Sequence, residues 1–182
     1  MDWTNPGSGN EPQDYWKHIE RSEFLHKFID GVIPKDLEII ELGCNCGRNV
    51  AYLNSKGYKT FGFDINPKAI EFKKDLPIWH QSIEDYFSKD VEVDMYFSMA
   101  VLEHIKSDWV FKKMKAAYIL TIEDEITDGG AFHKRNYKEI FESLGYRQIK
   151  HETNREFFIT PYEVRLFIND SLIRRRKIST EH

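Results

Sequence analysis

The sequence predicts an α/β fold with a mostly parallel sheet, and three observations support this prediction. Residues 37–42 are mostly apolar and are followed by a glycine-bearing turn and then by apolar residues at helical spacing. A second apolar stretch, residues 59–63, ends in a carboxylate, Asp64. Further apolar strands alternate with helical segments up to a final strand pair. Strands buried on both faces, as in residues 37–42, are typical of parallel sheets with helices on both faces.

Composition describes a globular chain of one domain. The chain has 182 residues, 41% of them hydrophobic and 31% charged, which suits a folded core rather than disorder. No apolar run approaches the roughly 20 residues that a membrane span needs. The polar N-terminus shows no signal peptide, so we expect a cytoplasmic protein without a membrane span. The formal net charge of −4 makes a nucleic-acid partner an unfavoured expectation.

The chain has two cysteines, Cys44 and Cys46, which lie in the turn after the first strand. A single intervening residue would strain a disulfide between them, and two sulfurs do not make a structural zinc site. We therefore expect small buried residues in a reducing compartment and no metal.

The N-terminal part divides into a leader and a helical segment. Residues 1–12 are rich in Asn, Gly and Pro and should be a flexible leader. Residues 14–33 carry apolar side chains at helical spacing, which predicts one or two helices packed on the sheet. Residues 13–170 are expected to form the single domain, and residues 171–182 a basic tail.

The turn after the first strand has the chemistry of a nucleoside-cofactor site. Small residues there let a ligand approach the backbone at a helix N-terminus, and Asp64, about 20 residues on, can accept hydrogen bonds from ribose hydroxyls. A dinucleotide site needs G-x-G-x-x-G, but the chain has Gly43, Asn45 and Arg48 at those positions. This disfavours a nicotinamide-dependent oxidoreductase.

Residues 41–47 read E-x-G-x-N-x-G and resemble motif I of the class I S-adenosylmethionine-dependent methyltransferases, usually E/D-x-G-x-G-x-G. Glu41, Gly43 and Gly47 match, with Cys44 between them, and Asn45 replaces the middle glycine. Asn is among the non-glycine residues best able to adopt a positive φ, so we expect the turn to survive. The resemblance implies that these residues bind S-adenosylmethionine. An ordinary strand-to-helix turn is the alternative.

The next blocks extend the resemblance to the methyltransferases. Residues 63–70, FDINPKAI, resemble motif II, which implies that Asp64 binds the ribose and Ile65 packs on the adenine. After a short strand at residues 77–80, Ser82 and Ile83 occupy places where the family binds the adenine amino group and ring. Ser82 could equally be only a helix N-cap.

Residues 93–105 resemble motif IV of the small-molecule branch, ending in Leu102, Glu103 and His104. We expect strand four at residues 93–97, with Ser98 directly after it at the cofactor site. His104 is a candidate for substrate binding, although a packing role is the more common one. Residues 106–115 should form a helix that leads straight into strand five.

The carboxyl end of strand five is where this fold usually builds its acceptor site. The loop there is dense in polar side chains, which suggests a small polar acceptor, and a solvated loop with helix capping is the alternative. His133 and Glu125 are the candidate bases, because the unperturbed pKa of a histidine side chain lies near neutrality and His133 lies in the right place. The expected substrate-binding residues of this region are Glu123, Arg135, Asn136 and Tyr137.

A strand pair at residues 146–152 and 163–168 completes the chain. The resemblance therefore implies the seven-stranded Rossmann-like methyltransferase sheet, mostly parallel with an antiparallel C-terminal strand. We expect methyl transfer to an oxygen of a small sugar or hydroxy acid, by in-line displacement. The N-P-P-[YF] tetrad of nucleic-acid amino methylation is absent from the sequence. A module that binds S-adenosylmethionine or S-adenosylhomocysteine without catalysis, for example as a partner subunit, is the alternative. The oligomeric state does not follow from the sequence.

Overall fold

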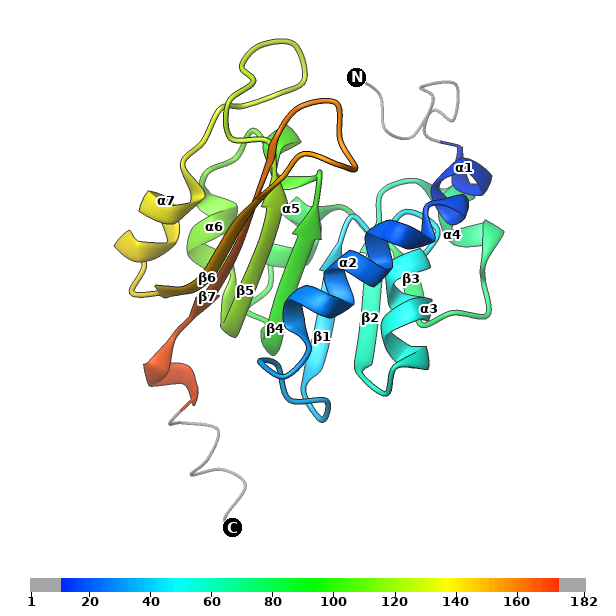
Figure 1. The fold of residues 1–182 in the computed structure, drawn as a ribbon, viewed down its shortest axis with the longest axis horizontal. Helices are drawn as coiled ribbons and strands as arrows, with labels where there is room; N and C mark the ends of the chain where they lie inside the picture. Colours follow the sequence, from blue (N-terminus) through cyan, green and yellow to red (C-terminus); the bar gives the residue numbers. More distant parts are fainter. Residues whose placement is uncertain (1–10, 174–182) are drawn as a thin grey trace. The chain divides into compact units, whose positions relative to one another are not determined.

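The computed structural model describes residues 11–173 and contains a seven-stranded sheet (Figure 1). The strand order is β3-β2-β1-β4-β5-β7-β6. Among the strand pairs with a defined register, β1–β2, β2–β3 and β4–β5 are parallel. Strand β7 is antiparallel to both β5 and β6. The predicted fold class is therefore confirmed. Most of the predicted leader and of the predicted basic tail, residues 1–10 and 174–182, lies outside the described residues.

The described residues form two compact units, residues 11–88 and 89–173. The first begins with two helices, α1 (Pro12–Lys17) and α2 (Ile19–Ile29). Pro12 suits the first helical turn because its missing N–H would have no partner there. His18 leaves the helical region, with φ −84° and ψ 57°, and separates the two helices.

The central motif of this unit is strand β1 (Glu38–Leu42), helix α3 (Arg48–Ser55) and strand β2 (Lys59–Asp64). The two strands are parallel, with Glu38 beside Lys59 and Leu42 beside Phe63. Gly57, with φ +87°, follows the end of α3, where a left-handed glycine commonly ends a helix. The crossover helix returns the chain so that the carboxyl ends of both strands meet at one edge.

Helix α4 (Pro67–Phe72), strand β3 (Ile78–His80) and helix α5 (Ile83–Phe87) complete the first unit. The side chain of Asn66 accepts from two backbone N–H groups at the start of α4. Ser82 accepts from Asp85 N at 3.0 Å and caps α5. Both helices therefore start where the capping residues predict them.

The second unit contains strand β4 (Glu92–Met99), the 3₁₀ turn η2 (Leu102–His104), helix α6 (Trp109–Lys113) and strand β5 (Lys115–Glu123). Two sequence predictions were wrong here. Ser98 lies within β4, not after it, because it pairs with Thr121 of β5. The helix expected over residues 106–115 is confined to α6, because the chain is extended at Ile105 and β5 already begins at Lys115.

Helix α7 (Tyr137–Ser143) and strands β6 (Arg147–Asn154) and β7 (Tyr162–Ile168) follow. Strand β7 runs antiparallel to β5, with Glu123 beside Glu163, and Figure 1 shows the β6–β7 hairpin alongside β5. The start of β7 therefore lies at the carboxyl end of β5.

Each unit has its own apolar core. The largest fully buried aromatic side chains are Phe63 and Phe87 in the first unit and Tyr96, Phe97, Tyr137, Phe141 and Phe167 in the second. Within residues 11–173, no helix is both long and apolar enough to cross a membrane.

Candidate functional site

The turn between β1 and α3 is built on three left-handed residues. Gly43, Asn45 and Gly47 have φ of +66°, +48° and +75°. The prediction that Asn45 adopts a positive φ in place of glycine is confirmed. Its side-chain Oδ1 accepts from Cys46 N at 2.8 Å, which helps to hold the backbone in this conformation.

Asp64 ties this turn to the end of β2. Its Oδ2 accepts from Asn45 N at 2.7 Å, and its Oδ1 accepts from Asn66 N at 2.8 Å. Burial raises the pKa of Asp64, while these backbone N–H groups lower it. The phenol of Tyr15 has its pKa raised by burial and then by the negative charge of Asp64. The predicted ribose-binding carboxylate therefore lies at the glycine turn with an aromatic hydroxyl beside it.

Gly62 of β2 is needed for the close approach of turn and strand, and sequence reasoning did not single it out. A Cβ at this position would lie 2.7 Å from Cys44 Cβ and 3.1 Å from Val50 Cγ2. Its place in an apolar strand two residues before Asp64 was the available signal. The thiols of Cys44 and Cys46 are both buried and free, and burial raises their pKa values.

Glu41 is the most buried charged residue of the turn region, with 3% of its surface exposed. Its Oε1 accepts from Asn49 Nδ2 at 2.6 Å, whereas Oε2 has no hydrogen-bond partner among the described residues. Asn49 Oδ1 in turn accepts from Ser22 Oγ at 2.6 Å and from Arg48 Nη2 at 3.2 Å. A buried polar network thus joins β1 and α3 to helix α2.

The N-terminal helix α1 is bound to the same turn. Arg48 Nη1 donates to Tyr15 O at 2.9 Å, and the Cys46 thiol donates to Pro12 O at 3.3 Å. Trp16 instead packs edge-on against Phe72, with ring centroids 6.5 Å apart. Of these two aromatic residues of α1, Tyr15 interacts electrostatically with Asp64 and Trp16 packs on α4.

The other predicted cofactor residues of this unit differ in exposure. Ile65 is exposed and follows Asp64, and its carbonyl lies 3.0 Å from His80 Nε2. Ile83 is buried in α5. Ser82 is the N-cap described above, so one of its two expected roles is observed.

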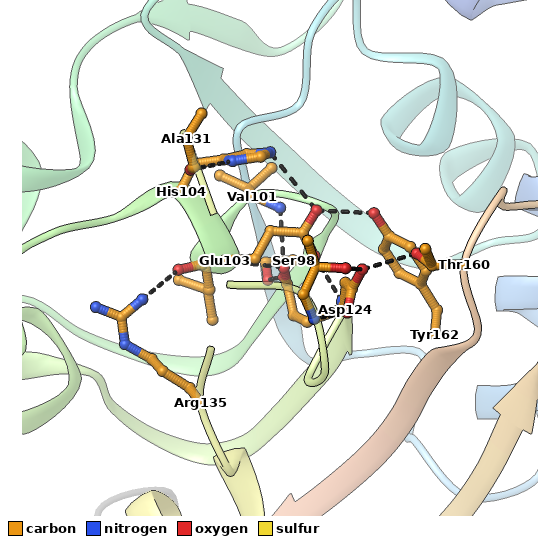
Figure 2. Close-up of polar contacts among 12 residues, drawn as sticks. Ser98, Val101, Glu103, His104, Asp124, Ala131, Arg135, Thr160 and Tyr162 are labelled. Atoms are coloured by element: carbon orange, nitrogen blue, oxygen red, sulfur yellow. Dashed lines mark hydrogen bonds and ion pairs between the residues drawn. The ribbon is translucent and has the colours of Figure 1, made fainter. Parts of the chain in front are cut away.

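The second unit carries a buried carboxyl pair, Glu103 and Glu123, at the carboxyl ends of β4 and β5. Figure 2 shows the surroundings of Glu103. Glu123 Oε1 accepts from the Ser98 hydroxyl, and Oε2 accepts from Val101 N at 3.0 Å and Glu103 N at 3.2 Å. Burial and the neighbouring Glu103 raise the pKa of Glu123 well above its usual range. Burial also raises the pKa of Glu103, to about 7.

Glu103 connects three segments of this unit. Its Oε2 accepts from Asp124 N and its Oε1 accepts from Tyr162 Oη at 2.7 Å. Asp124 Oδ2 accepts from Thr160 Oγ1 at 2.7 Å, which holds the segment before β7 to the end of β5 (Figure 2). Sequence reasoning noted Glu103 only as part of a motif and missed Asp124 and Tyr162, because their contacts join residues 36 and 59 positions apart.

Two histidines lie beside this carboxyl pair. His104 Nδ1 lies 2.8 Å from Ala131 O and its Nε2 lies 3.5 Å from Glu103 Oε1. Burial lowers the pKa of His104, and the electrostatic influence of His133 lowers it further. His133 donates its backbone N–H to Glu103 O at 2.8 Å, and its side chain is half-buried. The predicted base and the predicted substrate-binding histidine therefore lie near each other.

The remaining predicted acceptor residues have structural partners. Glu125 forms a two-pronged ion pair with Arg165 of β7, at 2.7 and 3.1 Å. Arg135 donates to Leu102 O and Ile105 O, and Asn136 caps α7. Tyr137 is fully buried, and its hydroxyl has no hydrogen-bond partner within the described range. These contacts indicate that Glu125, Arg135 and Asn136 have mainly structural roles, in packing and helix capping.

Comparison with known proteins agrees with the glycine turn and the strand order. Residues 40–117 match the methyltransferase-domain family. The chain therefore contains a segment similar to this methyltransferase domain. The cofactor that this similarity implies is S-adenosylmethionine. No protein of curated function matches the sequence of this chain.

Solved structures share the fold of this chain at low sequence identity. Magnesium protoporphyrin IX methyltransferase from Synechocystis PCC 6803, with bound S-adenosylhomocysteine, is 13% identical, with a TM-score of 0.69 over 84% of each chain. A methyltransferase from Archaeoglobus fulgidus is 16% identical, with a TM-score of 0.63 over 88% of this chain and 95% of that one. A Burkholderia thailandensis 1,6-didemethyltoxoflavin N1-methyltransferase is 13% identical, with a TM-score of 0.63 over 86% and 81%.

The residues of the first unit fit the cofactor. S-adenosylmethionine offers ribose hydroxyls and an α-ammonium group, all hydrogen-bond donors. Asp64 has acceptor oxygens at the turn, and Glu41 has a buried oxygen without a hydrogen-bond partner in the described part of the chain. Among residues 11–173, no group of three or more His, Cys, Asp or Glu side chains is placed to hold a metal ion.

Proposed function

We propose that this methyltransferase transfers a methyl group to an oxygen of a small polar acceptor of the sugar or hydroxy-acid type. The observation that carries the proposal is the polar cluster at the carboxyl ends of β4 and β5. Glu103 and Glu123 form the buried carboxyl pair there, and Tyr162 and His104 contact Glu103. Ligands of open α/β sheets bind beyond the carboxyl ends of the strands.

For the cofactor, we propose roles in the first unit that follow from the motif positions. Asp64 accepts from the ribose hydroxyls, and the backbone from Gly43 to Gly47, including Cys44 and Asn45, lies against the amino-acid half. Ile65 and Ile83 pack on the adenine, and Ser82 bonds its amino group. Glu41 receives the α-ammonium group. Ser98, which donates to Glu123, supports the acceptor cluster more directly than the cofactor.

Methyl transfer requires little from the protein beyond positioning of the acceptor. The cofactor supplies an activated methyl group on a sulfonium sulfur. The chain has to hold the acceptor oxygen in line with that carbon and exclude water. A hydroxyl acceptor also loses its proton as the new bond forms. We propose His133 as the base, because it lies beside His104 and the carboxyl pair. Glu125, held by Arg165, is a weaker candidate.

The acceptors of the similar proteins vary. One is named for a porphyrin and another for a toxoflavin precursor. A shared fold therefore does not select the acceptor, and the site residues must determine it. The acidic net charge and the absence of the N-P-P-[YF] tetrad of nucleic-acid amino methylation from the sequence support a small-molecule acceptor over a nucleic-acid acceptor.

The test incubates the purified protein with methyl-labelled S-adenosylmethionine and a cell extract separated into small-molecule and macromolecular fractions. We expect label in small molecules whose methyl group resists the base treatment that cleaves methyl esters. His133→Ala should reduce labelling at least tenfold, whereas Lys134→Ala, an exposed neighbour, should not.

Each other outcome has a definite meaning. Label confined to nucleic acid or protein would overturn the small-molecule acceptor, and N-linked methyl groups would overturn the oxygen acceptor. Unchanged labelling by both His133→Ala and Glu125→Gln would remove the proposed base. No labelling, with S-adenosylmethionine still bound, would favour a non-catalytic binding module.

A further inference from the structure

Asp124, the first residue after β5, is a buried carboxylate without a role in the proposed methyl transfer. Its Oδ1 accepts from Ile126 N at 2.8 Å and from Thr127 N at 2.9 Å. Its Oδ2 accepts from the hydroxyl groups of Thr127, at 2.5 Å, and of Thr160, at 2.7 Å. Burial raises the pKa of Asp124, but these hydrogen bonds lower it below its usual value. The group is therefore a carboxylate at neutral pH.

The hydrogen bonds of Asp124 join two loops at the carboxyl end of β5 (Figure 2). Two of its partners belong to the loop that follows β5, whereas Thr160 belongs to the loop between β6 and β7, residues 155–161. The backbone N–H of Asp124 donates to Glu103 Oε2. One residue thus fixes both loops to the carboxyl pair of the proposed acceptor cluster.

A second contact holds the loop of residues 155–161 at the same place. The ring of Phe158 stacks on the ring of Tyr162, with centroids 3.8 Å apart and an interplanar angle of 16°. The hydroxyl of Tyr162 donates to Glu103 Oε1 at 2.7 Å. The loop is therefore attached to the acceptor cluster at two points, and the fold sets its position.

The two loops carry exposed isoleucines beside the residues that Asp124 binds. Ile159 precedes Thr160 and is fully exposed, and Ile126, whose N–H donates to Asp124, is 58% exposed. Among the described residues of the second unit, Trp109 is the only other large apolar side chain that is exposed. Single exposed apolar side chains are common. Two of them on loops fixed by one carboxylate, at the edge where the acceptor is proposed to bind, indicate a ligand with apolar surface.

We propose that the two loops joined by Asp124 form an apolar wall of the acceptor site, and that the acceptor carries an apolar group beside the hydroxyl that is methylated. Asp124 is a positioning residue that acts through Thr160, and Ile126 and Ile159 determine specificity. The inference rests on the proposed methyl transfer to a small molecule at this edge. It narrows the acceptor to sugars or hydroxy acids that bear an alkyl or aryl group.

The experiment measures methyl transfer from labelled S-adenosylmethionine to increasing amounts of the small-molecule fraction of a cell extract. Each variant gives a half-saturating amount of the fraction and a maximal rate. Ile159→Ser should raise the half-saturating amount about fivefold, because an apolar contact is lost, and leave the maximal rate unchanged. Thr160→Val should also raise it about fivefold, because the bond of Asp124 that crosses between the loops is lost. The labelled product should pass from water into ethyl acetate.

Each of these variants has a matched control. Thr127→Val also removes a hydroxyl donor to Asp124 Oδ2, but within one loop, so it is the control for Thr160→Val. Ile19→Ser, at an exposed isoleucine of the first unit, is the control for Ile159→Ser. Neither control should change the half-saturating amount. Because Ile159 is fully exposed, Ile159→Ser should also leave the free energy of unfolding unchanged, which separates its effect on the acceptor from an effect on folding.

The outcomes separate this inference from the proposed function. If wild type labels small molecules but Ile159→Ser or Thr160→Val leaves the half-saturating amount unchanged, the inference is overturned and the proposed function stands. An equal rise in Thr127→Val and Thr160→Val, or labelled products that stay in water, would overturn the inference in the same way. The absence of any labelled small molecule with wild type would overturn the proposed function, and this inference with it.

Discussion

At the scale of single residues, the turn after β1 depends on whether a side chain can sit at a positive φ. Asn45 does so at +48° and uses its own Oδ1 to hold Cys46 N. The motif therefore needs the backbone shape rather than glycine itself. This explains how the sequence can depart from the family pattern at its middle position and keep the turn.

Asn45→Gly should keep the turn and change the free energy of unfolding by less than about 1 kcal/mol, because it loses one hydrogen bond but no allowed backbone conformation. Asn45→Val should lower that free energy by about 2 kcal/mol, since a β-branched side chain is strained at positive φ and cannot bond Cys46 N. Urea unfolding of both variants tests this. Equal stability of the two would show that the turn does not need the left-handed conformation.

Asp64→Ala should weaken binding of S-adenosylhomocysteine by about 1–3 kcal/mol, the cost of losing charge-assisted hydrogen bonds. Part of this loss comes from the ribose and part from the turn, because Asp64 also holds Asn45 N. Asp75→Ala, at an exposed carboxylate of the same unit, is the matched control. An unchanged dissociation constant in Asp64→Ala would mean that the ribose lies elsewhere.

At the scale of elements, the two strands that frame the acceptor cluster are joined by side chains. Glu125 follows β5 and pairs with Arg165 of β7, and Glu103 binds Tyr162 at the start of β7. The sequence shows that Glu103 and Glu125 are polar but does not show that their partners lie 59 and 40 positions further on. The sequence therefore could not reveal that Glu125 and Arg135 have structural partners, and their roles in acceptor binding stay predictions.

Arg165→Met should lower the free energy of unfolding by about 3 kcal/mol, because it leaves the largely buried Glu125 carboxylate without its cation. The double variant Glu125→Gln/Arg165→Met should recover much of that loss, since no charge then remains without a partner. Denaturant unfolding of both single variants and the double variant measures the coupling. Strictly additive effects would show that the pair contributes little.

At the scale of the whole molecule, buried carboxyl groups dominate the pH response. Burial raises the pKa of Glu41 to about 8 and of Glu103 to about 7, and that of Glu123 is raised as well. At pH values between the usual pKa of a glutamate side chain and these raised pKa values, the folded chain therefore binds more protons than the unfolded chain. This preferential proton binding stabilises the folded chain at low pH. The stabilisation is lost as the pH rises through the pKa values of the folded state.

We accordingly expect the free energy of unfolding to fall between pH 6 and 8, by roughly 1–3 kcal/mol per pH unit. Glu41→Gln should reduce that slope by about 1.4 kcal/mol per pH unit, and Glu71→Gln, at an exposed residue, should leave it unchanged. Urea unfolding across this range measures both slopes. A stability that rises with pH in wild type would contradict the assignment of neutral buried carboxyl groups.

Features with a local sequence signal could be predicted, whereas contacts between distant elements could not. The positions of the first two strands and of the glycine turn follow from local signals, namely the apolar runs, the small residues between them and Asp64 after the second run, whereas the seven-stranded sheet was implied by the family resemblance. The network from Glu41 through Asn49 to Ser22 joins three elements. It has no local signal, because a buried polar contact depends on how helices pack. The extent of β4 was also missed, since Ser98 is polar but lies inside the strand.

The central claim is that the turn from Gly43 to Gly47, with Glu41 and Asp64, binds S-adenosylmethionine. Calorimetric titration of the purified protein with S-adenosylmethionine, S-adenosylhomocysteine and NAD tests it most directly. We predict saturable binding of the first two ligands and none of NAD. Binding of NAD, or of none of the three, would contradict the claim.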